Sequence, residues 1–471
     1  MMNSYDKTDK WSILEYSKQL LGKTLEEAVA PVIIDPMRGK GQLGQLVELY
    51  FFGIENNSRQ EADFPEAVLE LKVTPLKELK DKTLAIKERL VCTMIDFTKD
   101  QAIPFEQSHI YLKCAYMLIP FYLHKEGVPV HQLKFIYDVL WQIPDKDLLI
   151  MKQDYEKIIA KIKAGKAHEL SEGDTTYLGA CRKGQKGDAD VEYTLLDGSQ
   201  AAVPAPRRAF SLKMQYMRTI LEFAKKSGGQ GTSNLSALVQ GFGPHLVDES
   251  ELQRKSFEDI LLERFEPYYG LTYSEICKKI GVQESTAKHK YAIATNLILT
   301  ENETKGKEVT KSEEFIKSGI VLKSVRVEKN GHINEHISFE AIDYIELMEE
   351  KNWYDSRFYE LVTQRFLFVT YRKKAVDGVE DYRLDKVFFW TMPNYAIEEA
   401  ERFWQNIKDN VEHNDFNPRN YYKIKDHKIF HFRPHGRDSL DMTANPNGGV
   451  VQKYGYWINK DLIEHVIRDA I

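Results

Sequence analysis

The sequence predicts a mixed α/β protein in which one folded unit occurs twice. Residues 41–52 place apolar side chains at three- and four-residue spacing, which is typical of an amphipathic helix. Residues 67–74 alternate apolar and charged side chains, as a strand with one buried face does. Residues 314–325 then repeat features of residues 63–74, and further segments repeat in the same order, which indicates a duplication. We therefore expect two copies of a mixed sheet flanked by helices.

The remaining elements of the first copy follow from local patterns along the chain. Apolar segments are separated by charged ones, and the amphipathic pattern is clearest in the last helix. We expect a helix over residues 12–30, a charged turn at 77–82, a helix over 87–97, a strand or strand pair over 109–122 and an amphipathic helix over 154–164.

A segment rich in glycine and serine separates the two copies. It begins at Ser227 with Ser-Gly-Gly-Gln-Gly-Thr-Ser, a composition typical of a flexible coil. We expect a first domain at residues 1–226, a linker at residues 227–250 and a second domain at residues 251–471.

The overall composition is that of an ordinary globular protein. The 471 residues are 29% charged and 42% hydrophobic, with a formal net charge of −6. This balance excludes nucleic-acid binding by bulk charge, so such binding needs local basic patches. The four cysteines lack zinc-binding spacing, which favours buried thiols in a reducing cytosol. Because there is no apolar signal region and the longest apolar run, residues 115–123, is too short to span a bilayer, we expect a cytoplasmic protein without a membrane partner.

The pattern D-x6-E-x-K, formed by Asp63, Glu70 and Lys72, carries the chemistry. In a strand, Glu70 and Lys72 point to one face while Leu69 and Leu71 point to the other. Two carboxylates can hold a hard divalent cation such as Mg²⁺, and a lysine beside them can orient water or stabilise charge on a phosphate, which together suit phosphodiester cleavage. Chance supplies this spacing about once or twice in such a chain, and a solvated strand face is the alternative, so the surrounding motifs decide.

The second copy lacks the central acid of this pattern. When the two segments are superimposed, Lys323 falls on Lys72 but Val321 falls on Glu70. A valine cannot bind Mg²⁺, so we expect the second copy to have lost the cleavage chemistry. The same superposition places Glu314 on Asp63, and the later matches are residues 177–182 with 429–433 and residues 208–213 with 454–459.

Five segments in a fixed order carry a resemblance to known nucleases. They are Lys40-Gly-Gln-Leu-Gly-Gln-Leu-Val-Glu48, Asp63-Phe-Pro-x4-Glu70-Leu-Lys72, Glu106-Gln-Ser-His109-x3-Lys113, Tyr177-Leu-x3-Arg182-Lys183-Gly184 and Phe210-Ser-Leu-Lys213. The first copy resembles the MutH nickases of mismatch repair, which act at GATC. The whole chain resembles the Sau-type restriction endonucleases that cut GATC. The resemblance implies a duplicated PD-(D/E)xK restriction-endonuclease-like fold with a degenerate second copy, and Ser211 departs from it where the nickases have tyrosine.

The resemblance also implies which residues act. The catalytic residues by this interpretation are Glu48, Asp63, Glu70, Lys72 and Lys113, of which Asp63, Glu70 and Glu48 hold Mg²⁺. The DNA-binding residues are Lys40, Arg182, Lys183, Lys186, Arg207, Arg208 and Lys213. His109 is a candidate general base because histidine titrates near neutral pH, although a structural hydrogen-bonding role is favoured.

We therefore expect a type II restriction endonuclease. It would hydrolyse double-stranded DNA at GATC with Mg²⁺, leaving 5′-phosphate ends, while the second domain binds DNA as a regulator. Because GATC is a palindrome, cutting both strands calls for a dimer on DNA or for binding of two sites. The alternatives are a GATC nickase of the mismatch-repair kind, a DNA-binding accessory protein that does not cut, and a nuclease for RNA or another sequence with the same chemistry.

Overall fold

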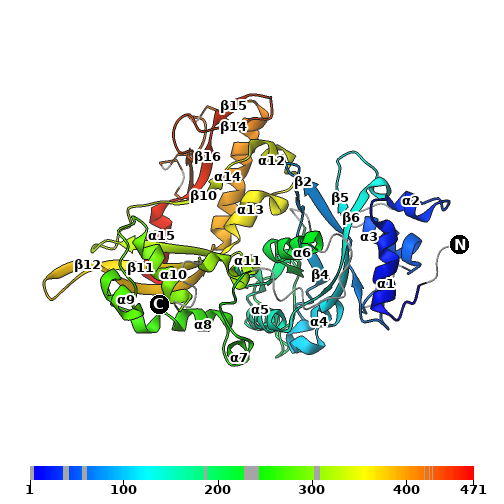
Figure 1. Ribbon diagram of the computed structural model, residues 1–471, viewed down its shortest axis with the longest axis horizontal. Coiled ribbons are helices and arrows are strands. Elements are labelled where there is room, and N and C mark those ends of the chain that lie inside the picture. Colours follow the sequence, from blue (N-terminus) through cyan, green and yellow to red (C-terminus); the bar gives the residue numbers. More distant parts are fainter. Residues whose placement is uncertain are drawn as a thin grey trace. The chain divides into compact units, whose positions relative to one another are not determined.

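The chain folds into two compact units in the computed structural model, which describes residues 5–35, 42–55, 61–184, 188–226, 243–301 and 308–470 apart from 418, 424 and 427 (Figure 1). The first unit is Met1–Arg254 together with Lys311–Gly319, and the second is Lys255–Thr310 together with Ile320–Ile471. Most of the predicted linker, residues 227–242, lies outside the described residues. Within the described part of the chain, no helix is long and apolar enough to cross a membrane.

The first unit combines short helices with two small sheets. Its principal elements, in chain order, are α1 (Lys10–Ser17), α2 (Leu25–Val29), α3 (Gln42–Leu46), a π-helical segment (Val47–Phe52), β1 (Glu70–Leu71), β2 (Thr74–Glu78), β3 (Leu84–Ile86), β4 (Leu90–Met94), α4 (His109–Cys114), β5 (Tyr116–Leu123), β6 (Lys134–Gln142), α5 (Asp145–Lys163), β7 (Leu178–Arg182), β8 (Arg208–Leu212), α6 (Met214–Lys226), α7 (Glu249–Leu252) and α11 (Glu313–Ser318).

The larger sheet of the first unit is built around β5. Both β1 and β2 run parallel to β5 in one register, since Glu70 pairs with Met117 and Thr74 pairs with Phe121. They therefore act as one strand that is interrupted at Lys72. On its other side β5 pairs antiparallel with β6, and β3 adds to β2. A separate antiparallel sheet has the order β4-β8-β7.

Burial explains why β5 is central. Met117, Leu118, Ile119 and Phe121 are all fully buried, as expected of a strand that is covered on both faces. In Figure 1, α1 covers one side of β5 and β6 while α6 covers the other. The α1 helix begins where Asp9 accepts hydrogen bonds from two backbone N–H groups of the first turn.

Two of the predicted elements are wrong. The helix expected over residues 87–97 is strand β4, because buried Leu90 and Cys92 alternate with β-branched residues at the period of a strand. The strand expected over residues 109–122 begins instead with helix α4. Ser108 starts this helix by accepting a hydrogen bond from the Tyr111 N–H, and only then does β5 follow.

The predicted helices at residues 12–30, 41–52 and 154–164 are found, with changed bounds. The first is divided into α1, a short 3₁₀ turn (Lys18–Leu20) and α2, with Gly22 at a φ of 76° between the last two. The last begins earlier than expected, because Pro144 stands at its N-cap and Asp145 and Asp147 fill the first turn.

The second unit has more strand than the first. Its principal elements are α8 (Phe257–Glu263), α9 (Tyr273–Ile280), α10 (Lys290–Leu299), β9 (Val321–Val327), β10 (Ile337–Ala341), α12 (Tyr344–Glu349), α13 (Arg357–Val362), β11 (Arg365–Val376), β12 (Val379–Thr391), α14 (Asn394–Glu412), β13 (Phe430–Pro434), β14 (Met442–Ala444), β15 (Val450–Gln452), β16 (Tyr454–Ile458) and α15 (Lys460–Asp469).

The two units share one order of strand pairing. In the second unit β9 runs parallel to β11, which pairs antiparallel with the long strand β12, as β1, β5 and β6 do in the first. The antiparallel order β10-β16-β13 likewise matches β4-β8-β7. The register agrees to the residue, since Glu70 pairs with the second residue of β5, Met117, and Val321 pairs with the second residue of β11, Phe366.

One expected match fails in the structure. The sequence superposition placed Glu314 on Asp63, but Glu314 lies on α11, within the first unit. Its carboxylate is buried there, forms an ion pair with Lys146 and accepts a hydrogen bond from the Leu246 N–H. Glu314 therefore has a structural role in the first unit and no acid corresponds to Asp63 by this match.

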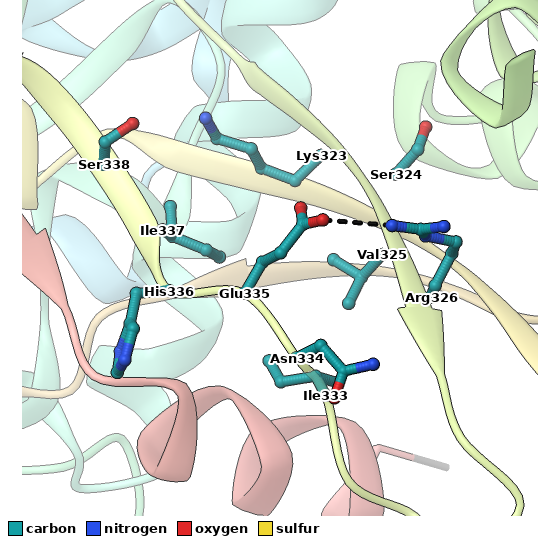
Figure 2. A pocket seen from close by; sticks show the side chains of 10 residues that line it. All are labelled: Lys323, Ser324, Val325, Arg326, Ile333, Asn334, Glu335, His336, Ile337 and Ser338. Carbon is teal, nitrogen blue, oxygen red and sulfur yellow. Dashed lines mark hydrogen bonds and ion pairs between the residues drawn. The ribbon is translucent and has the colours of Figure 1, made fainter. Parts of the chain in front are cut away.

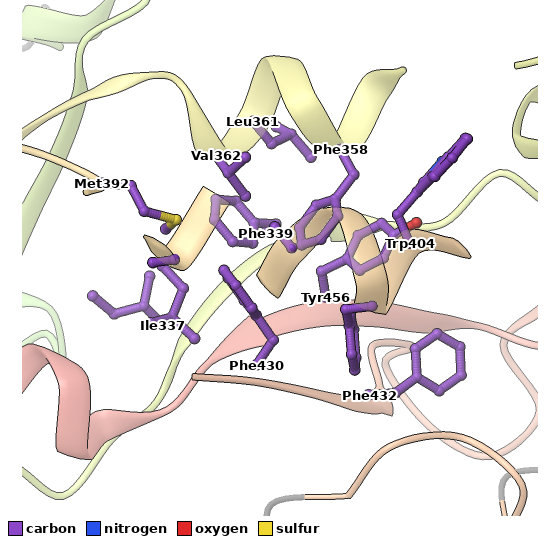
Figure 3. Packing of buried hydrophobic residues seen from close by; sticks show 14 of the residues in the cluster. Ile337, Phe339, Phe358, Leu361, Val362, Met392, Trp404, Phe430, Phe432 and Tyr456 are labelled. Atoms are coloured by element: carbon purple, nitrogen blue, oxygen red, sulfur yellow. The ribbon is translucent and has the colours of Figure 1, made fainter. Parts of the chain in front are cut away.

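Aromatic side chains form the core of the second unit (Figure 3). The ring of Phe358 on α13 stacks on Tyr456 of β16 with centroids 3.7 Å apart and meets the edge of Phe430 at 5.5 Å. Such ring pairs stabilise a core by about 0.5–1.5 kcal/mol each beyond the burial of their area. This packing fixes β10, β13 and β16 against α13, so the second unit has a core of its own.

Candidate active site

Glu70 is the centre of the candidate site in the first unit. Only 1% of its surface is exposed, and its Oε1 atom accepts from the Lys72 ammonium at 2.6 Å and lies 3.3 Å from the Lys113 ammonium. Its Oε2 atom is buried without a hydrogen-bond partner among the described residues. A buried carboxylate oxygen that lacks a donor is costly, and a bound cation would satisfy it.

Asp63 reaches Glu70 through a tight turn. Phe64 and Leu69 exchange backbone hydrogen bonds, which brings the Asp63 carboxylate to the Leu71 N–H at 2.9 Å. Inside this turn Val68 has a φ of 50°, a conformation that β-branched residues rarely adopt and that is often found beside functional sites. Burial, followed by the charge of Glu70, raises the pKa of Asp63 to about 6.

Glu48 is placed by the π-helical segment that follows α3. Its widened turn ends at Gly53, whose backbone N–H bonds to the Glu48 carbonyl. Burial and then the charge of Asp63 raise the pKa of Glu48 to about 7, with Lys72 acting in the opposite direction. Because each of the carboxyl groups Glu48, Asp63 and Glu70 influences another, the structure brings the three predicted acids together.

Lys72 and Lys113 supply the positive charge of the site. Lys72 follows Glu70 where the strand is interrupted, and its backbone N–H bonds to the Leu118 carbonyl. Burial alone would lower the pKa of Lys72, but the charge and hydrogen bond of Glu70 outweigh burial and raise it. Lys113 comes from the last turn of α4, and the cap at Ser108 fixes the start of this helix.

The donor set of this site fits a hard divalent cation. As the side chains stand, no group of three or more His, Cys, Asp or Glu in the described ranges is arranged to hold a metal ion. The unpaired Glu70 Oε2 atom nevertheless lies in a cluster of carboxyl groups, two of which have pKa values raised by burial first and by the neighbouring negative charge second. Carboxylate oxygens are the ligands that Mg²⁺ and Ca²⁺ prefer.

Two cysteine thiols near Lys72 were not predicted as part of this site. Both Cys92 and Cys114 are buried and reduced, which confirms the expectation of buried thiols. The hydrogen bond between Cys114 and Cys92, followed by burial, holds the pKa of Cys114 well above its usual range, so the thiol stays neutral. The sequence signal that was available is the position of Cys114 directly after Lys113.

The predicted DNA-contact residues fall into three groups. Lys40 and Lys186 lie outside the described residues. Lys183 and Arg207 lie side by side at the ends of β7 and β8, because the Lys183 N–H donates to the Arg207 carbonyl at 2.7 Å. Arg182, on the last position of β7, is half-buried and pairs in register with Arg208.

Arg208 and Lys213 have intramolecular partners instead of open positions. Arg208 is buried and donates to the Ala180 carbonyl at 2.7 Å. Lys213 donates to the Thr175 carbonyl, and its charge acts against the effect of burial, which raises the pKa of Asp154. Both side chains therefore hold the β7–β8 sheet together, and their contact with DNA stays a prediction.

A cavity of about 790 Å³ reaches from Lys113 on α4 to Arg207, which precedes β8. Lys113, His109 and Arg207 are among its lining residues. The Nδ1 atom of His109 is buried without a hydrogen-bond partner among the described residues.

Known proteins match both units. The family model "DNA mismatch repair enzyme MutH" matches residues 52–154 and again residues 306–403. The type II restriction enzyme Sau3AI of Staphylococcus aureus is 32% identical over 475 residues, which cover 94% of this chain and 93% of that enzyme. The chain belongs to the Sau3AI family of type II restriction enzymes. As a member it is a site-specific deoxyribonuclease with MutH-like regions.

Single MutH proteins match about half of this Sau3AI-type chain. The mismatch repair protein MutH of Shewanella amazonensis is 29% identical over 216 residues, covering 45% of this chain and 93% of that protein. MutH of Vibrio vulnificus is 27% identical over 220 residues, covering 46% of this chain and 93% of that protein. The second MutH match includes β9, so the family model and the strand pairing point to the same repeated region.

Proposed function

We propose that this chain cuts both strands of DNA at GATC in a Mg²⁺-dependent reaction that leaves 5′-phosphate ends. The proposal rests on one observation above others: Glu70 is buried between two lysines and keeps one oxygen without a donor, beside two further carboxyl groups. Carboxylates that can hold a divalent cation beside lysines suit metal-assisted phosphodiester hydrolysis, and this chemistry agrees with the similarity to a type II restriction enzyme.

Each residue of the site has a distinct part in the proposed reaction. Asp63 and Glu70 would hold the cation, with Glu48 as a further carboxylate ligand or as a partner for bound water. The cation, when bound, supplies Lewis acidity and lowers the pKa of water. Lys113, from α4, would place its positive charge on the phosphate as negative charge grows there during attack.

Lys72 acts through its charge in this proposal. Its pKa is raised, so the side chain remains an ammonium ion at neutral pH and cannot take a proton from water. Glu70 would hold the cation, which would neutralise part of its negative charge. The Lys72 ammonium group would then donate to the attacking oxygen or to a phosphate oxygen and so orient the nucleophile.

The second unit would serve as a regulator with a degenerate copy of the PD-(D/E)xK fold. In the shared register, Val321 of β9 corresponds to Glu70 of β1. Leu361 of α13 corresponds in the same way to Lys113 of α4, because each lies five residues after the serine that caps its helix, Ser356 or Ser108. With neither side chain able to bind a cation or a phosphate, this unit has no means to cut. It would bind DNA and promote cleavage by the first unit.

One intact site in a chain must act twice on a palindrome. Either two chains meet on one GATC site, or one chain holds a second copy of the site in its second unit. Plasmids with one and with two GATC sites distinguish these arrangements. Equal rates on both plasmids at every enzyme concentration would exclude the two-site arrangement.

Digestion of a plasmid with Mg²⁺, followed by sequencing of the fragment ends, tests the proposal. We expect linear products whose ends all lie at GATC and carry 5′-phosphates, and no products when Mg²⁺ is omitted. Nicked circles that never become linear would instead support a nickase. Intact plasmid would support an accessory protein that binds DNA without cutting it. Cleavage of RNA with the plasmid left intact would show that the substrate is RNA.

A further inference from the structure

The degenerate site of the second unit contains a lysine without an acidic partner. Lys323 occupies in β9 the position that Lys72 occupies after Glu70, and its side chain lines a cavity of about 250 Å³ (Figure 2). Within the described residues, no side chain accepts a hydrogen bond from its ammonium group or lies at ion-pair distance. Burial with no nearby carboxylate lowers the pKa of Lys323, which is the reverse of the effect at Lys72.

The loss of the acidic residues changes the net charge of the site from negative to positive. In the first unit three carboxyl groups face two lysines, an arrangement suited to a cation. In the second unit Val321 replaces Glu70, while the hydroxyl of Thr295 bonds to the Ser324 hydroxyl of β9 at 2.9 Å. The cavity is lined by two cations, Lys323 and Arg326, and by one acid, Glu335, so its half-buried ammonium group favours the binding of an anion.

A second cation borders the same cavity. Arg326 pairs with Glu335 at 3.0 Å, and both side chains are exposed, by 48% and 79% of their surface. Exposed pairs of this kind are weak and exchange readily for a stronger ligand. As Figure 2 shows, Glu335 bonds to Arg326 and not to Lys323. An entering anion therefore finds Lys323 without an ion-pair partner among the described residues, and Arg326 in a pair that is easily broken.

We propose that this cavity binds a backbone phosphate of DNA directly, without a metal ion, with Lys323 as the principal ligand and Arg326 as the second. This inference rests on the proposed function, because it identifies where the regulatory unit holds its DNA. The register supports DNA over other anions: β9 presents Lys323 as the first unit presents Lys72, which would face the phosphate that is cut. The former cleavage site thus becomes a phosphate-binding site.

Binding of a fluorescent 16-base-pair GATC duplex to the full chain without divalent ions tests the inference, with stoichiometry from sedimentation. The wild-type chain should bind two duplexes. Lys323→Gln should weaken one of the two binding events about tenfold or more and reduce the slope of log K against log salt by about 1. Lys323→Arg should retain most of the binding, and Lys329→Gln, which removes an exposed lysine of the same unit, is the matched control.

Thermal unfolding separates DNA from free phosphate as the source of the anion. At equal ionic strength, the thermal unfolding midpoint of the wild-type chain should be higher in inorganic phosphate than in chloride. The midpoint of Lys323→Gln should be the same in both salts. Because Lys323 has no acid to neutralise, the variant should unfold in chloride no earlier than the wild type. A lower midpoint in chloride would indicate a structural role and contradict the inference.

Two further outcomes would overturn it. Equal duplex affinity and equal salt slope for Lys323→Gln and Lys329→Gln would remove the DNA ligand from this cavity. If Lys323→Gln loses the stabilisation by inorganic phosphate but binds the duplex as the wild type does, the cavity binds free phosphate and not DNA. A wild-type chain that binds two duplexes through Lys323 but does not cut with Mg²⁺ would refute the proposed function alone, so the two failures are distinguishable.

Discussion

Removal of the Glu70 carboxylate should destabilise the first unit strongly in the absence of metal. At an effective dielectric constant of about 20, charges 2.6 Å and 3.3 Å apart attract by roughly 6 and 5 kcal/mol, most of which offsets the loss of hydration. Glu70→Ala leaves Lys72 and Lys113 without their shared partner. Removal of one partner of a buried pair costs about 3–5 kcal/mol, and we expect that loss here.

The double variants identify which contact carries the loss. The Lys72 ammonium is nearer to the Glu70 carboxylate than the Lys113 ammonium is, at 2.6 Å against 3.3 Å, so Glu70→Ala/Lys72→Met should recover more stability than Glu70→Ala/Lys113→Met. In a double-mutant cycle, the interaction energy between two contacting residues is about 0.5–3 kcal/mol. Urea unfolding with EDTA gives these values, and the transition of the second unit is the internal control because two-unit chains need not unfold in one step.

The refuting result is specific. If Glu70→Ala unfolds at the same urea concentration as the wild type, Glu70 does not neutralise the two lysines in solution. If both double variants have the same free energy of unfolding, the Lys72 and Lys113 contacts, at 2.6 Å and 3.3 Å, contribute equally to stability. Either result would remove the electrostatic basis of the candidate site.

Three further predictions concern other parts of the molecule. The raised pKa values of Glu48 and Asp63 mean that the folded, metal-free chain binds more protons than the unfolded one, so stability should fall as pH rises from about 4 to about 7; Glu48→Gln should flatten that fall in pH-dependent urea unfolding. Val321→Glu should not restore cutting by the second unit, because a single acid does not rebuild a site; a Val321→Glu chain that also carries Lys72→Ala and still cleaves plasmid would show otherwise. Lys317→Met should destabilise the first unit by about 3–5 kcal/mol, since it leaves Asp147, 2.6 Å from the ammonium group, as an unpaired buried charge; a change below about 1 kcal/mol in urea unfolding would contradict this.

The residues of the candidate site were predictable because their chemistry follows from strand geometry. The alternation of side chains places Glu70 and Lys72 together, and the observed contact at 2.6 Å agrees with this. The duplication was also predictable, since the expected matches of residues 177–182 and 208–213 lie on β7 and β8, which correspond in sheet order to β13 and β16. Glu48 and Lys113 lie outside this strand and were predicted from the family resemblance.

Long-range contacts explain what the sequence did not predict. Glu314 matched Asp63 in spacing, but its ion pair with Lys146, far away in the chain, holds it on α11. Strand β4 was predicted as a helix because its pairing with β8, more than a hundred residues later, decides its conformation. Arg208 was expected at a surface because its charge is visible in the sequence, whereas its burial against the Ala180 carbonyl is not.

The most direct test of the central claim is the single-turnover cleavage rate of a GATC duplex with Mg²⁺ for Glu70→Gln beside Glu78→Gln. Glu78 lies at the exposed end of β2, so its variant removes a similar charge from the same strand line outside the site. The account predicts that Glu70→Gln loses about a thousandfold in rate while its affinity for the duplex is retained, and that Glu78→Gln cuts as the wild type does. A Glu70→Gln chain that cuts within tenfold of the wild-type rate would contradict the claim that this carboxylate is the centre of the active site.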